Sequence, residues 1–172
     1  VDLRQSHAFL QTVLDNLPVA VSVKDWRGDR LGTYTYWNRT CEQLFGITAE
    51  QALGKTAHEC FSPAEAEILH HKDQDIFTRG LTESSLETPI NLQHKGIRLL
   101  HTTKVPIFDE QHGPQYLLCI SEDITDRQRA ADRLRQQAER EALLAAITND
   151  IRQSLNLKQI LNTTVEEVRQ FL

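Results

Sequence analysis

The stretch that most constrains this chain runs from Tyr116 to Arg127 and reads YLLCISEDITDR. Its first half is apolar, as is typical of a buried strand, whereas its second half is polar and begins a long charged segment. A core strand is therefore expected to lead directly into a helix.

The turning point of this stretch has side chains that can fix it. Thr125 precedes Gln128 by the spacing of a capping box, in which a hydroxyl and a carboxamide satisfy the first backbone groups of a helix. Asp123, at the strand end, is within reach of Arg127 one helical turn later. These four residues are predicted to form a junction between strand and helix. Since many capped junctions are purely structural, the rest of the chain has to support a functional interpretation.

The composition limits the classes of function. A chain of 172 residues, 40% of them hydrophobic and 25% charged, is expected to form one domain with extensions. The net charge of −5 gives little attraction to nucleic acid or anionic membranes, and no apolar run approaches the roughly 20 residues needed to span a bilayer. We therefore expect neither a nucleic-acid partner nor a membrane segment.

The three cysteines, Cys41, Cys60 and Cys119, are too far apart to suggest a metal site or a disulfide framework. A reducing cytoplasm is the expected location. The chain begins with Val and has no Met, so we expect it to be a fragment of a longer protein.

The first part of the chain alternates short elements with clear end signals. An amphipathic helix over residues 3–14 is expected to end before Pro18, and strands are expected at 19–23 and 33–37. A short helix follows, with Asn38 as its cap and Gly46 as its end, and Thr48 and Gln51 form a second capping box.

The next part predicts a longer helix and three strands. Ser62 and Pro63 begin a helix that Gly80 ends, with Ala66, Leu69, Asp73, Ile76 and Phe77 along one side. Turn signals then separate strands at 86–92, 97–108 and 116–124.

This order of elements and several motifs resemble PAS domains, the sensory modules of bacterial signalling proteins. Asp123-Ile124-Thr125 followed by Arg127 resembles the DIT signature of the PAC motif that closes these domains. Further matching positions are Lys24-Asp25, Asn38, Gly46, Gly54-Lys55-Thr56, Gly80 and Gly96. The resemblance implies an α+β fold with a five-stranded antiparallel sheet and short helices on one face. It divides the chain into an N-terminal flanking helix at 1–17, a PAS domain at 18–125 and a long C-terminal helix.

The resemblance also implies a ligand cavity between the sheet and the short helices. Its expected lining is Val21, Leu44, Phe45, Phe61, Leu69, Phe77, Leu118 and Ile120. The position that matches the flavin-binding cysteine of light-sensing members is Ala57, and Cys60 lies three residues further. His70 is the candidate haem ligand, close to but out of register with the position that haem-binding members use. We therefore expect no cofactor, with a haem or flavin sensor of oxygen, redox state or light as the alternative.

Residues 126–142 read as a coiled-coil linker. Ala131, Leu134, Ala138, Ala142 and Ala145 form a narrow apolar seam with charged flanks, in steps of 3, 4, 4 and 3 residues. Residues 143–172 read as two helical pieces that meet near Asn156, and they resemble the opening helices of GAF domains, another sensory module. We expect a homodimer formed through the helical ends, with GAF and kinase domains further along the same polypeptide.

No catalytic constellation is present in this sequence. It has no Gly-rich phosphate loop, HExxH or GxSxG motif, and no His beyond His112 that could be a phosphoacceptor. We therefore interpret the chain as a non-enzymatic sensory and dimerisation module of a cytoplasmic two-component sensor histidine kinase. It would pass a signal through the junction at residues 123–125 to the C-terminal helix. A ligand-free dimerisation spacer in a diguanylate cyclase or kinase is a further alternative.

Overall fold

The computed structural model describes residues 3–29, 31–86, 89–92 and 94–170, and it divides into two units that meet after Thr125. The first unit contains the sheet and five helices, and the second is the helix α6 (Thr125–Gln170). Among the described residues no helix is both long and apolar enough to cross a membrane.

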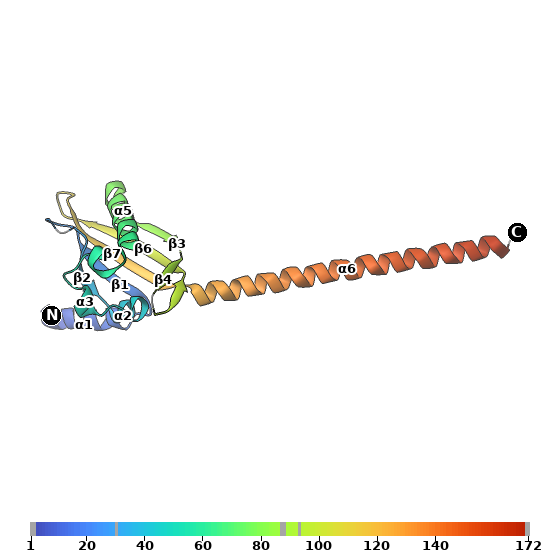
Figure 1. The fold of residues 1–172 in the computed structure, drawn as a ribbon, viewed down its shortest axis with the longest axis horizontal. Coiled ribbons are helices and arrows are strands. Elements are labelled where there is room, and N and C mark those ends of the chain that lie inside the picture. Colours follow the sequence, from blue (N-terminus) through green and yellow to red (C-terminus); the bar gives the residue numbers. More distant parts are fainter. Residues whose placement is uncertain (1–2, 30, 87–88, 93, 171–172) are drawn as a thin grey trace. The chain divides into compact units, whose positions relative to one another are not determined.

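The first unit is built on a five-stranded antiparallel sheet, shown in Figure 1. Its strands, in spatial order, are β2 (Thr33–Trp37), β1 (Ala20–Asp25), β7 (Pro114–Asp123), β6 (Leu100–Phe108) and β3 (Glu83–Leu86). A separate pair is formed by β4 (Ile90–Leu92) and β5 (Gly96–Arg98). The α+β fold expected from the sequence is thus confirmed.

Two expected strands are divided. The strand expected over 97–108 is split into β5 (Gly96–Arg98) of the small sheet and β6 (Leu100–Phe108) of the large one. The prediction of a strand over 86–92 is corrected, because β3 ends at Leu86 in the large sheet and β4 begins at Ile90 in the small one. Residues 87, 88 and 93 lie outside the described residues. The alternation of apolar residues could not reveal that the chain leaves one sheet for another.

Five helices precede β3 in the first unit. They are α1 (Leu3–Asp15), α2 (Arg39–Phe45), α3 (Ala49–Ala52), α4 (Ala57–Cys60) and α5 (Pro63–Arg79). The predicted caps are confirmed, since the side chains of Asn38, Thr48 and Ser62 accept hydrogen bonds from the backbone of the first turns of α2, α3 and α5. Gly80 ends α5 with a φ of 66°, a conformation that glycine adopts without strain.

The side chain of Asn38 connects three elements of the first unit. Its Oδ1 accepts hydrogen bonds from the backbone N–H of Val21 in β1, at 2.9 Å, and of Cys41 in α2, at 3.0 Å. Its Nδ2 donates to the carbonyls of Leu14 at the end of α1, at 2.9 Å, and of Val19 at 3.0 Å. Asn38 is fully buried, so each of these backbone groups would lack water if the side chain were removed.

The second unit corrects a prediction about the C-terminal segment. The two helical pieces expected to meet near Asn156 are one continuous helix, because α6 runs through Asn156 without a break. The capping pattern at Asn156 predicts a helix start, but the same residues are also compatible with a helix interior. Leu172 lies outside the described residues.

The Asn38 network generates the first prediction. Asn38→Ala should lower the free energy of unfolding of the first unit by about 3 kcal/mol or more, because it leaves several buried backbone groups without a partner. Urea unfolding measures this change. Thr48→Ala is the control, since it removes an exposed cap and should cost about 1 kcal/mol. Equal losses in the two variants would contradict the role of Asn38.

Candidate functional site

A cavity of about 370 Å³ lies against one face of the large sheet. The strands contribute Ala20, Ser22, Lys24, Tyr34, Trp37, Leu100, Thr102, Lys104, Cys119 and Ser121 to its lining. The helices and the β4 segment contribute Cys41, Phe45, Phe61, Glu65, Ile68, Leu69, Lys72, Pro89, Ile90 and Asn91. Its volume is within the range of roughly 300 to 1,000 Å³ that is common for small-molecule sites.

The structure places only part of the predicted lining at this cavity. Phe45, Phe61 and Leu69 line it. Leu44 is instead in the main apolar core, and Phe77 stacks on Trp26 with ring centroids 4.9 Å apart.

The three predicted strand residues are offset by one position. Val21, Leu118 and Ile120 alternate along β1 and β7 with the residues that do line the cavity, so they lie on the other face of the sheet. A shift of one residue exchanges the faces of a strand, which is why an apolar pattern buried on both sides cannot identify the cavity face.

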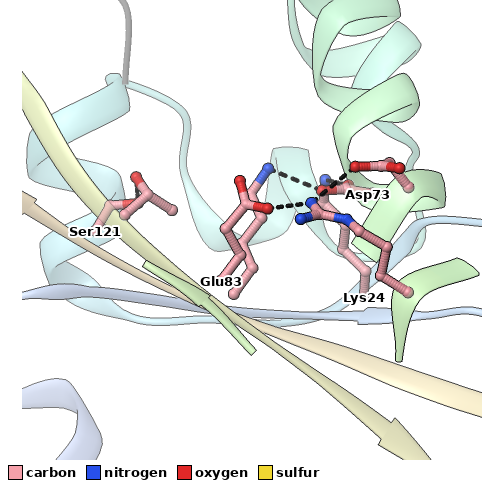
Figure 2. A network of polar contacts seen from close by, with 8 residues as sticks. Lys24, Asp73, Glu83 and Ser121 are labelled. Carbon is pink, nitrogen blue, oxygen red and sulfur yellow. Dashed lines mark hydrogen bonds and ion pairs between the residues drawn. The ribbon is translucent and has the colours of Figure 1, made fainter. Parts of the chain in front are cut away.

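The most unusual feature of the cavity wall is a cluster of three buried charges. The Asp73 carboxylate of α5 reaches the sheet, where Lys24 Nζ donates to its Oδ2 at 2.5 Å (Figure 2). Lys104 Nζ of β6 lies 2.9 Å from the other oxygen, Oδ1. All three side chains are at most 6% exposed. One carboxylate thus faces two ammonium groups in a site without bulk water.

The opposite charges of Asp73 and Lys24 stabilise the ionised form of each other. Burial alone would raise the pKa of Asp73, but the nearby ammonium groups of Lys24 and Lys104 hold it below its ordinary value. Burial alone would lower the pKa of Lys24, but the attraction of Asp73 raises it. Lys24 Nζ also lies 5.1 Å from the centroid of the Tyr34 ring, a cation–π contact.

Neutral polar groups also line the cavity. Ser22, Thr102 and Ser121 provide hydroxyls, and Thr102 and Ser121 share a hydrogen bond of 2.9 Å between neighbouring strands. Burial raises the pKa of Cys119 to about 11 and that of Cys41 to about 12, so both thiols are protonated at neutral pH. These groups can hydrogen-bond a ligand, but the thiols are poor nucleophiles.

The candidate cofactor ligands lie elsewhere. His70 stacks on Trp26 with ring centroids 5.7 Å apart and does not line the cavity. Ala57 is buried in α4, and Cys60 packs against the main apolar core. Among the described residues no group of three or more side chains could hold a metal ion.

The junction forms, and it includes a backbone partner, Leu99, that was not predicted. Asp123 Oδ1 accepts from the backbone N–H of Thr125 at 3.0 Å and from its hydroxyl at 2.5 Å. The Thr125 hydroxyl oxygen accepts from the backbone N–H of Leu99 at 2.8 Å, and the Ile124 N–H donates to the Leu99 carbonyl at 2.9 Å. The residues before β6 and after β7 are therefore bonded to each other at the start of α6.

One detail of the predicted junction is corrected. Gln128 does not complete a capping box with Thr125, because its carboxamide donates to Asp132 at 3.4 Å, within α6. Asp123 forms an ion pair with Arg98 at 3.8 Å, and its contact with Arg127, in the first turn of α6, stays a prediction. The local spacing suggested a cap, but a backbone group 26 residues earlier in the chain engages the threonine instead.

The charged cluster was missed from the sequence. The sequence predicts Asp73 on the inner side of its helix and Lys24 only as part of a motif. The sequence does contain one indication, because β1 and β6 each have a lysine at a position that faces the core. On β6, Leu100, Thr102 and Lys104 lie on one face of the strand. Without the fold, nothing assigned the two lysines to one carboxylate.

Comparisons with known proteins identify a matching family and a curated relative. The family described as PAS fold matches residues 14–129. A diguanylate cyclase from Vibrio cholerae is 31% identical over 140 residues, which cover 81% of this chain and 42% of that protein. The chain thus spans less than half of the length of this curated relative.

Solved structures share the fold of the first unit. The PAS domain of BvgS from Bordetella pertussis is 22% identical with a TM-score of 0.59, over 78% of this chain and 98% of that one. The complex of VqmA from Vibrio cholerae with ligand and DNA is 25% identical with a TM-score of 0.57, over 73% of this chain and 52% of that one.

The charged cluster generates the second prediction. Asp73→Asn should lower the free energy of unfolding at pH 7 by about 3 kcal/mol or more, because it leaves two buried ammonium groups without a counter-charge. The Asp73 pKa is lower in the folded state than its unfolded value of about 3.9. The difference between wild type and variant should therefore be complete above that pH and shrink as the pH falls through the folded pKa.

Urea unfolding at pH 7 and pH 3 tests this prediction. Asp75→Asn is the matched control, because Asp75 lies on the same helix but forms an exposed ion pair with Arg79. The control should change stability little at either pH. A loss in Asp73→Asn that matches the control, or that is the same at both pH values, would show that the cluster does not stabilise the fold.

Proposed function

The chain belongs to the PAS fold family, and on this premise we propose that its first unit is the ligand-responsive sensory domain of a longer signalling protein. The observation that supports this proposal is that cavity and junction share two strands. Leu100, which lines the cavity, pairs with Asp123 of the junction, and Ser121 lies two residues before Asp123 on the same side of β7. A ligand that moves these strands would act on the start of α6.

The ligand that we propose is not haem or flavin. His70 is held in a stack with Trp26, and no cysteine stands where the light-sensing members carry theirs. A small organic molecule is supported by the largely apolar lining with a few hydroxyl and ammonium groups. The three cysteines are free thiols, in keeping with a cytoplasmic location.

The output of the longer protein is a separate proposal. The first candidate is a diguanylate cyclase output domain. It is supported by the curated relative, whose name is diguanylate cyclase. A sensor histidine kinase, with a GAF domain between the two parts, is the second candidate and is implied by the resemblance of residues 143–172 to GAF helices. In both cases the chain itself would not be an enzyme, and it would change the activity of a domain beyond α6.

We also propose that α6 forms a parallel homodimer. The large apolar side chains of α6 whose burial the structure describes are more than 40% exposed, among them Leu134, Leu144, Ile147, Ile151 and Leu155. Leaving such surface in water costs roughly 25 cal/mol per Å², so a second helix is favoured. Two-fold symmetry along the helix would pass the same movement from two sensory domains to two outputs. Exposed Phe9, Leu10 and Val13 of α1 could provide a second contact.

The junction generates the third prediction. Asp123→Ala removes the two hydrogen bonds that Thr125 donates to Asp123. Because the Asp123 side chain is partly exposed, the free energy of unfolding of the first unit should fall by only about 1 to 2 kcal/mol. The response of the full-length protein should fall far more. It is measured as cyclic di-GMP formation from GTP or as autophosphorylation by ATP.

Asp126→Ala is the control for this experiment, since it removes a carboxylate from the first turn of α6. It should leave the response unchanged. Hydrogen exchange at the Leu99 amide provides a local readout, and it should become faster only in Asp123→Ala. Normal output from Asp123→Ala would mean that the junction is merely a structural cap.

The exposed helix generates the fourth prediction. The chain should sediment as a dimer, and truncation after Thr125 should make it a monomer, because the apolar surface of α6 is then absent. Ile151→Glu should also weaken the dimer by placing a charge on the apolar side. Gln153→Glu adds the same charge about 200° around the helix and should have little effect. A dimer that survives the truncation would assign dimerisation to the first unit.

A further inference from the structure

A buried lysine in the cavity wall has more hydrogen-bond donors than described partners. Lys104 is 5% exposed and lines the cavity. Its Nζ lies 2.9 Å from Asp73 Oδ1, and among the described residues no other group has hydrogen-bond geometry to it. A buried ammonium group has three N–H donors, and leaving them unsatisfied is costly. The lysine is therefore held in place by charge while its donors remain available on the cavity side.

The three side chains of the cluster carry one net positive charge, since Lys24 and Lys104 are positive and Asp73 is negative. Glu83, which lies opposite Lys104 in the β3–β6 pairing, forms an ion pair with Arg79 (Figure 2). Glu65 and Lys72 also line the cavity and carry opposite charges, so they leave this balance unchanged. Glu65 is further engaged by Ser62, whose hydroxyl donates to it at 2.6 Å. A ligand with one negative charge would neutralise the net charge of the cluster, whereas a doubly charged phosphate group would leave an excess negative charge.

The rest of the cavity indicates the body of such a ligand. Trp37, Phe45, Phe61, Leu69 and Leu100 give it apolar and aromatic walls. Its volume of about 370 Å³ equals roughly a dozen water molecules at about 30 Å³ each. A molecule of about a dozen non-hydrogen atoms, apolar except for one anionic end, matches both walls and size.

We propose that the cavity binds a small organic monocarboxylate, with its carboxylate on the Lys24–Lys104 side of the wall and its apolar body among the aromatic side chains. This inference rests on the proposed sensory function and names the chemical class of its ligand. The carboxylate accepts the N–H donors that Asp73 does not use, and the nearby hydroxyls of Thr102 and Ser121 can bond its second oxygen. Since Thr102 and Ser121 join β6 to β7, the ligand head contacts the two strands that lead to the junction.

Calorimetric titration with two acids and their isosteric amides tests the charge. Octanoate and 3-phenylpropanoate should bind the wild-type chain, and octanamide and 3-phenylpropanamide should bind about 10- to 100-fold more weakly, because they lack the charge. Amides that bind as tightly as their acids would overturn the inference and leave a neutral ligand for the same sensory domain. Failure of both acids to bind would also overturn it.

Lys104→Met tests the residue. This variant keeps the Lys24–Asp73 pair, so the buried cluster becomes neutral and the fold is preserved. Its affinity for the acids should fall about 10- to 100-fold, to that of the amides. Lys95→Met, in the exposed turn between β4 and β5, is the control and should bind like the wild type. Unchanged acid binding in Lys104→Met would overturn the assignment.

Asp73→Asn tests the opposite change, an increase in the positive charge of the cluster. It raises the net charge of the cluster to two positive charges, so the acids should raise its melting temperature more than that of the wild type. The amides should not. A variant stabilised equally by acid and amide would overturn the inference. The sensory role itself is tested by Asp123→Ala, an experiment that uses no added ligand, so the two failures can be told apart.

Discussion

The structure of the first unit depends on one buried carboxylate. Lysine is rarely buried, and a lysine without a counter-charge in the interior either loses its proton or destabilises the fold. Lys24 and Lys104 point inward from two strands that are not neighbours, and Asp73 is the group that compensates both. The pairing fixes the position of α5 over the sheet at this point. It also sets the polarity of the cavity that lies beside it.

The alternation of side chains along β6 and β7 connects the charged cluster with the junction at Asp123. On β6 the cavity side holds Leu100, Thr102 and Lys104, and on β7 it holds Cys119 and Ser121. Continuing that alternation by one step on β7 reaches Asp123, which holds Thr125 at the start of α6. A change at the cavity wall and a change at the helix start are thus connected by one side of two bonded strands. No flexible loop lies between them.

The second unit has a different physical character. The first unit buries its own core, whereas α6 exposes its apolar side chains along its described length. Such a helix gains stability from another helix and not from its own sequence propensity alone. The family comparison covers residues 14–129, which are the first unit from the end of α1 onward and only the start of α6. The similarity therefore supports a PAS fold for the first unit, and the role proposed for α6 rests on its exposed surface.

The amino-acid sequence by itself determined most of the order of elements and the caps of α2, α3 and α5. Asn38, Thr48 and Ser62 cap helices that begin within a few residues of them, and Gly46 and Gly80 end helices locally. These features act over three or four residues, so a single sequence shows them. The tertiary structure alone decided which strand face lines the cavity, where the prediction was offset by one residue at Val21, Leu118 and Ile120. It also decided that Lys24 meets Asp73, 49 residues away, and that Thr125 bonds Leu99, 26 residues away. Contacts over such distances depend on how strands register and helices cross the sheet, and local residue patterns do not contain that information.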